Sequence, residues 1–201
     1  MMKIQFNPNL EYQHDAINAI LGVFEGQEVR QANFSVPTIK RAQMEMLAEQ
    51  SDLGIGNKKE LLDDEILANV QKVQLTNGLK QSDSLGSMDF TVEMETGTGK
   101  TYVYLRSIFE MNRRFGFSKF IIVVPSIAIK EGVYKSLQIT EEHFKEHYDN
   151  VPYDYFIYDS SNLGEVRSFA TNASMCHEIV LACRCFAGKK VRFSHASFHT
   201  A

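Results

Sequence analysis

The sequence predicts an α/β domain built around a parallel sheet, and three observations support this. Short apolar runs alternate with segments of helical spacing from residue 90 onward. The first run leads through a glycine-rich turn, ETGTGKT, directly into a helical segment. The order strand, helix, strand, helix, strand favours parallel pairing through right-handed crossovers. Together these features predict half of an α/β sheet.

The composition allows one domain with a substantial core. The chain has 201 residues, of which 44% are hydrophobic, and a net charge of -4. The overall charge therefore does not indicate a basic surface for nucleic acid, although it does not exclude local basic patches. The start, MMKIQFNPNL, lacks the apolar stretch of a secretory signal, and no run approaches the roughly 18 apolar residues of a membrane span. The three cysteines are odd in number and lie late in the chain, which is no disulfide framework. We expect a soluble, cytoplasmic protein without membrane contact.

The first 87 residues are expected to be mainly helical. Residues 9–24 have an apolar stripe at helical spacing. Residues 25–87 are more polar. TIKRAQMEMLAEQSDLG predicts a helix ending near Gly54, and KKELLDDEILANVQKVQLTNG predicts a second helix that stops at Gly78. In the second helix, Leu62, Ile66, Asn69 and Val73 fall on one side. QSDSLGSMD is expected to be a loop.

The remaining elements alternate between strand and helix. Expected strands are Phe90–Met94, Phe120–Val124 and Tyr153–Tyr158, and expected helices are Thr101–Arg114 and Ile127–Leu137, with EEHFKEHY extending or following the latter. FIIVV is the continuous apolar run of a strand buried on both faces, and Pro125 ends it. We expect the three strands to form one parallel sheet, with loop 95–100 at its C-terminal edge.

The turn METGTGKT indicates a phosphate-binding loop. Gly97, Thr98 and Gly99 let the backbone turn several N–H groups inward, and the start of the following helix adds a positive end. Lys100 can reach the β- and γ-phosphates of ATP, and the Thr101 hydroxyl can bind Mg²⁺. Met94 stands where this motif normally opens with Gly or Ala. The alternative is an ordinary strand–turn–helix connection that is rich in glycine.

Two further sites are candidates. The amide of Gln13, which follows Tyr12, offers a donor and an acceptor that match an adenine edge. Alone, Gln13 would be a solvated helix residue. Pro125 and Ser126 follow a strand at the sheet edge where α/β proteins bind ligands, and the next helix with Lys130 could bind a DNA phosphate. The alternative is a proline strand stop beside an exposed lysine.

These pieces, in this order, resemble a superfamily-2 helicase motor domain. Four segments are also similar in sequence to the restriction (R) subunit of type III restriction–modification enzymes. They are YQHDAI, FTVEMETGTGKTYVYLRSIFEMN, FIIVVPSIAIKEGVYKS and YDSSNLGEVRSFATN. The resemblance covers about residues 1–173 and implies an incomplete, RecA-like P-loop NTPase fold, the first motor domain, with an insertion at about 30–87. It assigns ATP binding to Gln13, Thr96, Gly97, Thr98, Gly99, Lys100 and Thr101, and the DNA backbone to Pro125, Ser126 and Lys130.

The resemblance also implies what the protein does. Enzymes of this family use ATP and Mg²⁺ to move or signal along double-stranded DNA, and they cleave it in complex with a modification (methyltransferase) subunit. The acidic motif II, the second motor domain and the nuclease carboxylates are missing here, so we expect a truncated N-terminal part that is inactive alone. Open alternatives are another superfamily-2 helicase, of phage or plasmid, and a catalytically dead nucleotide-binding remnant.

The sequence after Asn172 no longer resembles that of the family. Residues 174–201 gain all three cysteines and three of the six histidines, and we expect them to pack poorly. EIVLA could imitate the next strand of the family. A zinc site at Cys183, Cys185, His195 and His199 is disfavoured, because Cys-x-Cys is unusual spacing for zinc and nothing frames a finger.

Overall fold

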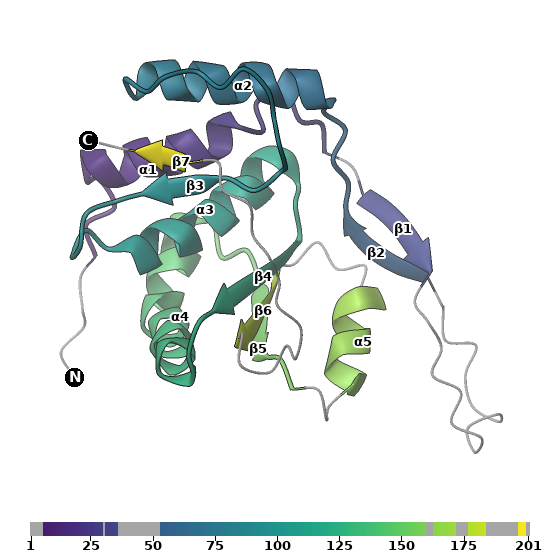
Figure 1. The fold of residues 1–201 in the computed structure, drawn as a ribbon. Coiled ribbons are helices and arrows are strands. Elements are labelled where there is room, and N and C mark those ends of the chain that lie inside the picture. The colour runs from purple at the N-terminus through teal and green to yellow at the C-terminus, as the bar shows by residue number, and fades with distance from the viewer. Residues whose placement is uncertain are drawn as a thin grey trace.

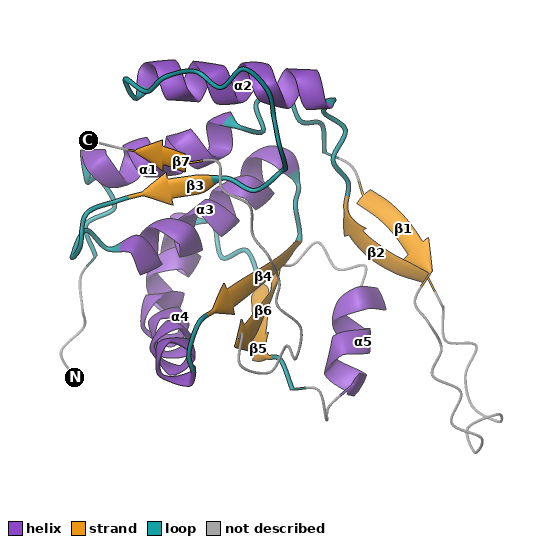
Figure 2. Ribbon diagram, in the orientation of Figure 1, coloured by secondary structure: helices purple, strands orange, loops and turns teal. Residues whose placement is uncertain are grey.

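The fold was obtained as a computed structural model. It describes residues 6–29, 31–35, 53–159, 163–171, 177–183 and 197–199. Its elements in chain order are α1 (Glu11–Gly22), β1 (Gln31–Ser35), β2 (Leu53–Asn57), α2 (Asp63–Thr76), β3 (Thr91–Glu93), α3 (Lys100–Phe115), β4 (Lys119–Val124), α4 (Ile127–His147), β5 (Tyr153–Ile157), α5 (Leu163–Thr171), β6 (His177–Cys183) and β7 (Ser197–His199). Figure 1 shows their arrangement, and Figure 2 separates helices from strands.

The main sheet is parallel and has the order β4-β6-β5. In β6, Ile179 stands opposite Phe120 of β4 and Tyr155 of β5. The two strands that follow each other in sequence, β4 and β5, are therefore separated by a strand from later in the chain. The α/β class with a parallel sheet is confirmed.

The short strand β3 does not belong to this sheet. It pairs in parallel with β7, and Val92 stands opposite Phe198. The expectation that residues 90–94, 120–124 and 153–158 share one sheet is therefore wrong for the first of them. Apolar periodicity identifies a strand but does not select its neighbour, and a strand of three residues carries few hydrogen bonds to decide the pairing.

One face of β4 is exposed, which corrects the expectation of burial on both faces. Ile121 and Val123 are 63% and 50% exposed, while Val124 is buried. The alternate residues Phe120 and Ile122 pack against the core. Helices α3 and α4 supply that core, whereas α5 approaches the opposite face at β5, where Phe156 meets Phe169 edge to face at 6.1 Å.

The region after residue 173 also departs from expectation. Residues 177–183 form β6, the central strand, and Ile179 and Leu181 are fully buried. The expectation of poor packing is thus wrong for this stretch, because three consecutive apolar residues fit between β4 and β5. The segment EIVLA, which was expected only to imitate a strand of the family, is part of strand β6. Residues 184–196, 200 and 201 lie outside the described residues.

The segment at about 30–87 is only partly helical. Strands β1 and β2 form an antiparallel pair, and helix α2 follows. The predicted helix ending near Gly54 falls mostly outside the described residues, and its last two residues lie in β2. The second predicted helix is confirmed as α2: Ile66 and Val73 are buried, Leu62 is 69% exposed, and Gly78 follows with a φ of 68°.

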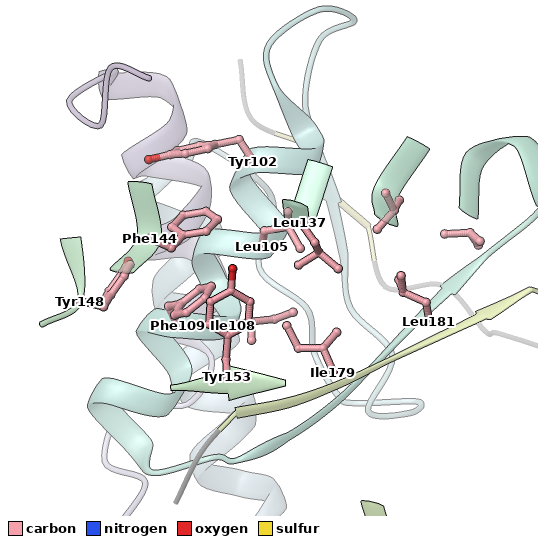
Figure 3. Packing of buried hydrophobic residues seen from close by; sticks show 12 residues of the cluster. Tyr102, Leu105, Ile108, Phe109, Leu137, Phe144, Tyr148, Tyr153, Ile179 and Leu181 are labelled. Atoms are coloured by element: carbon pink, nitrogen blue, oxygen red, sulfur yellow. The ribbon is translucent and has the colours of Figure 1, made fainter. Parts of the chain in front are cut away.

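Among the described residues, the largest buried cluster lies between α3, α4 and the main sheet (Figure 3). Phe109 stacks on Phe144 at 4.7 Å and on Tyr148 at 5.0 Å, and it meets Tyr153 edge to face at 5.0 Å. Aromatic pairs of this geometry add to the stabilisation from area burial. This cluster fixes α3 against the sheet.

A polar layer joins the N-terminal segment to α3 and α4. Arg106 is 5% exposed; its Nη1 donates to the carbonyl of Pro8, and its Nη2 lies 3.1 Å from Nε2 of His147. Since guanidinium has only donors, Nε2 of His147 accepts, which requires a neutral ring. The Tyr102 hydroxyl lies 2.9 Å from Nε2 of His143. Burial, His147 and Arg106 lower the pKa of His143, and burial together with Arg106 lowers that of His147.

The lowered pKa values predict loss of stability in mild acid. The unfolded chain takes up protons on these histidines as the pH falls through about 6.5, before the folded chain does. The free energy of unfolding should be constant above that pH, fall below it, and level off once the folded state is also protonated. Denaturant titrations between pH 7.5 and 5.5 measure this. His147→Gln keeps an acceptor for Arg106 but does not titrate, so it should flatten the curve. Lys135→Gln on the same helix is the control, and equal curves for all three proteins would contradict the prediction.

Helix α2 packs closely on α1. A Cβ built on Gly22 would lie 2.8 Å from Cγ2 of Val73, which is too close for any real contact. The interface buries apolar residues of both helices together with Leu61, namely Ala19, Val23, Leu61, Ile66, Val70 and Val73. The absence of a side chain at Gly22 therefore allows the helices to approach.

Gly22→Ala should destabilise the protein, despite the better helix propensity of alanine. Overpacking typically costs about 1–3 kcal/mol, against a gain of up to about 1 kcal/mol from propensity. In a Val73→Ala background the clash is gone, and the same change should be neutral or stabilising. The control is Gly132→Ala in α4, where nothing lies within 4 Å of the added atom and only the propensity gain remains. Equal effects of Gly22→Ala in both backgrounds would show that the helices are not in contact there.

Candidate nucleotide site

The loop between β3 and α3 has the backbone of an anion-binding turn. Gly97 and Gly99 have φ values of 85° and 83°, in the left-handed region that favours glycine, and α3 begins immediately at Lys100. The carbonyl of Glu95 accepts from Nζ of Lys100 at 2.8 Å and from Oγ1 of Thr98 at 2.7 Å. In this structure, the lysine that the sequence assigns to a phosphate is therefore hydrogen-bonded to the backbone of its own loop.

Gln13 supports this loop from α1. It is 5% exposed, and its Nε2 donates to the carbonyl of Thr98 at 2.9 Å. A Cβ on Gly99 would lie 2.7 Å from the same nitrogen, so a side chain there would displace the Gln13 amide as well as strain a backbone with a φ of 83°. Within the described structure, Oε1 of Gln13 is buried and has no hydrogen-bond partner. The alternative of a solvated glutamine is wrong. A primary amide retains a second N–H, so one donor and one acceptor remain for a ligand.

A cavity of about 660 Å³ opens beside the first half of the loop. Its lining residues are Tyr12 and Asp15 of α1, Thr76 and Asn77 at the end of α2, and Met94, Glu95, Thr96, Gly97 and Thr98. Lys100, Thr101 and Gln13 are not part of this lining, so the cavity lies beside the predicted phosphate contacts and does not include them. Tyr12 is 47% exposed and could stack on a base. The sequence pointed to Tyr12 but had no signal for Asp15, Thr76 or Asn77.

The sequence analysis did not single out two tyrosines near the start of α3: Tyr104 lies beside Thr101, whereas Tyr102 belongs to the core cluster. Burial raises the pKa of Tyr104, and the side chain of Thr101 acts in the opposite direction. The Tyr104 hydroxyl is buried beside the side chain of Thr101. Burial also raises the pKa of Tyr102. Both phenols are therefore neutral near pH 7, and Tyr104 lies close to the predicted metal-binding hydroxyl.

The described side chains do not form a metal cage. Within the part of the chain that the structure describes, no three His, Cys, Asp or Glu residues gather to hold an ion. Mg²⁺ in nucleotide sites is held mainly by phosphate oxygens and water with one or two protein ligands, so the Thr101 hydroxyl fits that role. The side chains of the zinc hypothesis, Cys183, Cys185, His195 and His199, lie outside the description.

The predicted DNA-contact residues begin helix α4. Ser126 is its N-cap, and its Oγ accepts from the backbone N–H of Ile129 at 3.3 Å. Pro125 follows β4 and is exposed, and its lack of a backbone N–H explains why the strand ends there. Lys130 is only 13% exposed, and its Nζ lies 3.7 Å from Glu131. The alternative of an exposed lysine is therefore incorrect. Helix geometry leaves the first N–H groups, those of Ile127 and Ala128, without an intrahelical partner.

Fold and loop together define an α/β domain of the P-loop helicase class. The sequence family described as "Type III restriction enzyme, res subunit" matches residues 8–165. The chain belongs to this family, which confirms the resemblance. It is 31% identical over 166 residues to the EcoPI Res subunit of Escherichia phage P1 and 31% identical over 163 residues to the EcoP15I Res subunit of Escherichia coli. These alignments cover 80% and 78% of this chain but 16% and 15% of those proteins.

A third relative matches more closely over a shorter stretch. The StyLTI Res subunit of Salmonella typhimurium is 48% identical over 61 residues, or 29% of this chain and 6% of that protein. Among the described residues, none of the helices is both long and apolar enough for a bilayer.

Proposed function

We propose that this chain binds ATP with Mg²⁺ at the loop and contacts double-stranded DNA through the start of α4, within a longer ATP-dependent type III restriction endonuclease. The backbone of the loop carries the proposal: two left-handed glycines stand directly before the N-terminus of a 16-residue helix. This arrangement presents N–H groups and a positive helix end to an anion.

Each residue has a proposed role. Lys100 leaves the carbonyl of Glu95 and binds the β- and γ-phosphates, and Thr101 is a ligand of the Mg²⁺ that ATP brings. Thr96, Gly97, Thr98 and Gly99 supply the turn around the phosphates. Gln13 holds the loop through Thr98, and its unpartnered Oε1 supports the further role of accepting from the adenine amino group.

Turnover of ATP is not proposed for the chain by itself. Hydrolysis by such motors requires an acid that holds Mg²⁺ and positions water. The sequence CRCFAGKK runs from the last residue of β6, and no Asp-Glu pair occurs in the last 40 residues. We propose that the chain acts in the cytoplasm, in a complex with the modification subunit. The names of the relatives, which call them restriction-modification enzymes, support this partner. A general DNA helicase is the weaker candidate, because the family match is to restriction subunits.

Lys100→Ala should weaken ATP binding. A charge-assisted contact contributes about 1.5–3 kcal/mol, so the dissociation constant should rise roughly 10- to 150-fold. Lys135→Ala, an exposed lysine on α4, is the matched control and should leave affinity unchanged. Isothermal titration measures both.

Phosphate release by the unsubstituted chain, with or without duplex DNA, should equal that of Lys100→Ala. DNA-stimulated release above that level would show a working motor.

The DNA contact predicts a position-dependent effect of charge on α4. Ala128 is exposed in the first turn, and Gln138 is exposed three turns later. Ala128→Glu should weaken duplex binding, because it places a carboxylate where the N–H groups would meet a phosphate. Gln138→Glu adds the same charge away from the helix start and should have little effect. Fluorescence anisotropy with a labelled duplex at two salt concentrations measures this, and equal losses in both variants would leave only a net-charge effect.

A further inference from the structure

Helix α2 is fixed beside the nucleotide loop, although the sequence places it in an insertion. Asn69 of α2 donates from Nδ2 to the carbonyls of Val23 at 3.2 Å and Glu25 at 2.8 Å, just after α1. These bonds act with the apolar interface that Gly22 allows. The end of α2 therefore has a defined position relative to Tyr12 and Asp15 on α1.

The chain that leaves α2 is tied back to it before it enters β3. Gln74 is 4% exposed, and its side chain exchanges two bonds of 2.8 Å with Ser82: Nε2 donates to Oγ, and Oε1 accepts from the backbone N–H. Gln71 also donates to the carbonyl of Ser82 at 2.8 Å. Figure 1 shows this return crossing α2 on its way to β3. The chain segment around Ser82 and α2 are thus parts of one packed unit.

The end of α2 forms one wall of the cavity beside the loop. Thr76 and Asn77 line it together with Tyr12 and Asp15 of α1. A second cavity, of about 480 Å³, runs on between α1 and α2 and shares Asp15, Thr76 and Asn77 with the first. The two cavities therefore adjoin along the end of α2, and the first of them reaches the phosphate loop at Met94–Thr98, so a nucleotide bound at the loop has space beside Thr76 and Asn77.

This wall offers mainly hydrogen-bond acceptors. Asn77 Nδ2 donates to the carbonyl of Val73 at 2.8 Å, and Thr76 Oγ1 donates to that of Lys72 at 2.9 Å. Asn77 Oδ1, the lone pairs of Thr76 Oγ1 and the Asp15 carboxylate remain as acceptors. Their complement is a ligand rich in donors, such as the ribose hydroxyls and the amino group of adenosine.

We propose that Thr76 and Asn77 bind the nucleoside of ATP opposite Tyr12, so that the inserted helix determines nucleoside recognition and not only the stability of the domain. The proposal rests on the proposed ATP function and adds to it a specific contact. Because α2 is fixed on α1 beside the phosphate loop, the nucleoside would also hold α2 in place when bound.

A tryptophan reporter tests the contact, since the chain has no tryptophan of its own. Thr76→Trp places the reporter in the cavity wall. Leu75→Trp, at the neighbouring residue, is 67% exposed in the unsubstituted protein and does not line the cavity. Emission is recorded while ATP or inorganic tripolyphosphate is added, and equilibrium dialysis of labelled ATP measures binding in the same samples.

The expected result is a change in Thr76→Trp emission with ATP but not with tripolyphosphate, and no comparable change in Leu75→Trp. Loss of ATP binding in Thr76→Trp alone, with tripolyphosphate binding retained, equally supports the proposal, because the ring then occupies the nucleoside's place. The proposal is overturned if ATP binds without a change in Thr76→Trp emission, or if both variants respond alike. Absence of ATP binding by the unsubstituted chain would overturn the proposed function itself, and this inference with it.

Discussion

The packing of α3 on two sides is the constraint on which the rest of the structure depends. One side of this helix meets α4 and the main sheet through Phe109, and the other meets α1 through residues that include Val103. A helix held in this way cannot shift along its axis without breaking both interfaces. The hydrophobic core therefore places the first residue of the helix, Lys100, and the loop before it is held in addition by the bond from Gln13 to Thr98.

The N-terminal segment is joined to the same helix at two separate points. Near the loop, Gln13 bonds to Thr98; about two turns along α3, Arg106 bonds to the carbonyl of Pro8. Arg106 is buried, and a buried charge is tolerated only where hydrogen bonds compensate for lost hydration. These two connections make α1 a support for the loop, and α2 is held on the far side of α1. A disturbance at α2 would thus reach the loop through packed contacts.

Much of the candidate site could be predicted because its chemistry is local. The left-handed turn at Gly97 and Gly99 and the helix start at Lys100 follow from residues that are adjacent in sequence. The position of Gln13 on an amphipathic helix was also predictable. Its burial against Gly99 was not, because the two are 86 residues apart and no periodicity connects them. The cavity residues Thr76 and Asn77 had no signal at all, since a threonine and an asparagine at a helix end are usually explained by the helix end itself.

The sequence alone determined the α/β class, the main helices, the glycine turn before α3 and the family, since each depends on local sequence pattern or on sequence similarity. Only the tertiary structure decided which strands are neighbours. It placed 177–183 between β4 and β5, paired β3 with β7, and left Ile121 and Val123 exposed. The physical reason is that a strand's period shows which residues share a face, whereas its partner and the cover over that face depend on what else the chain brings to it.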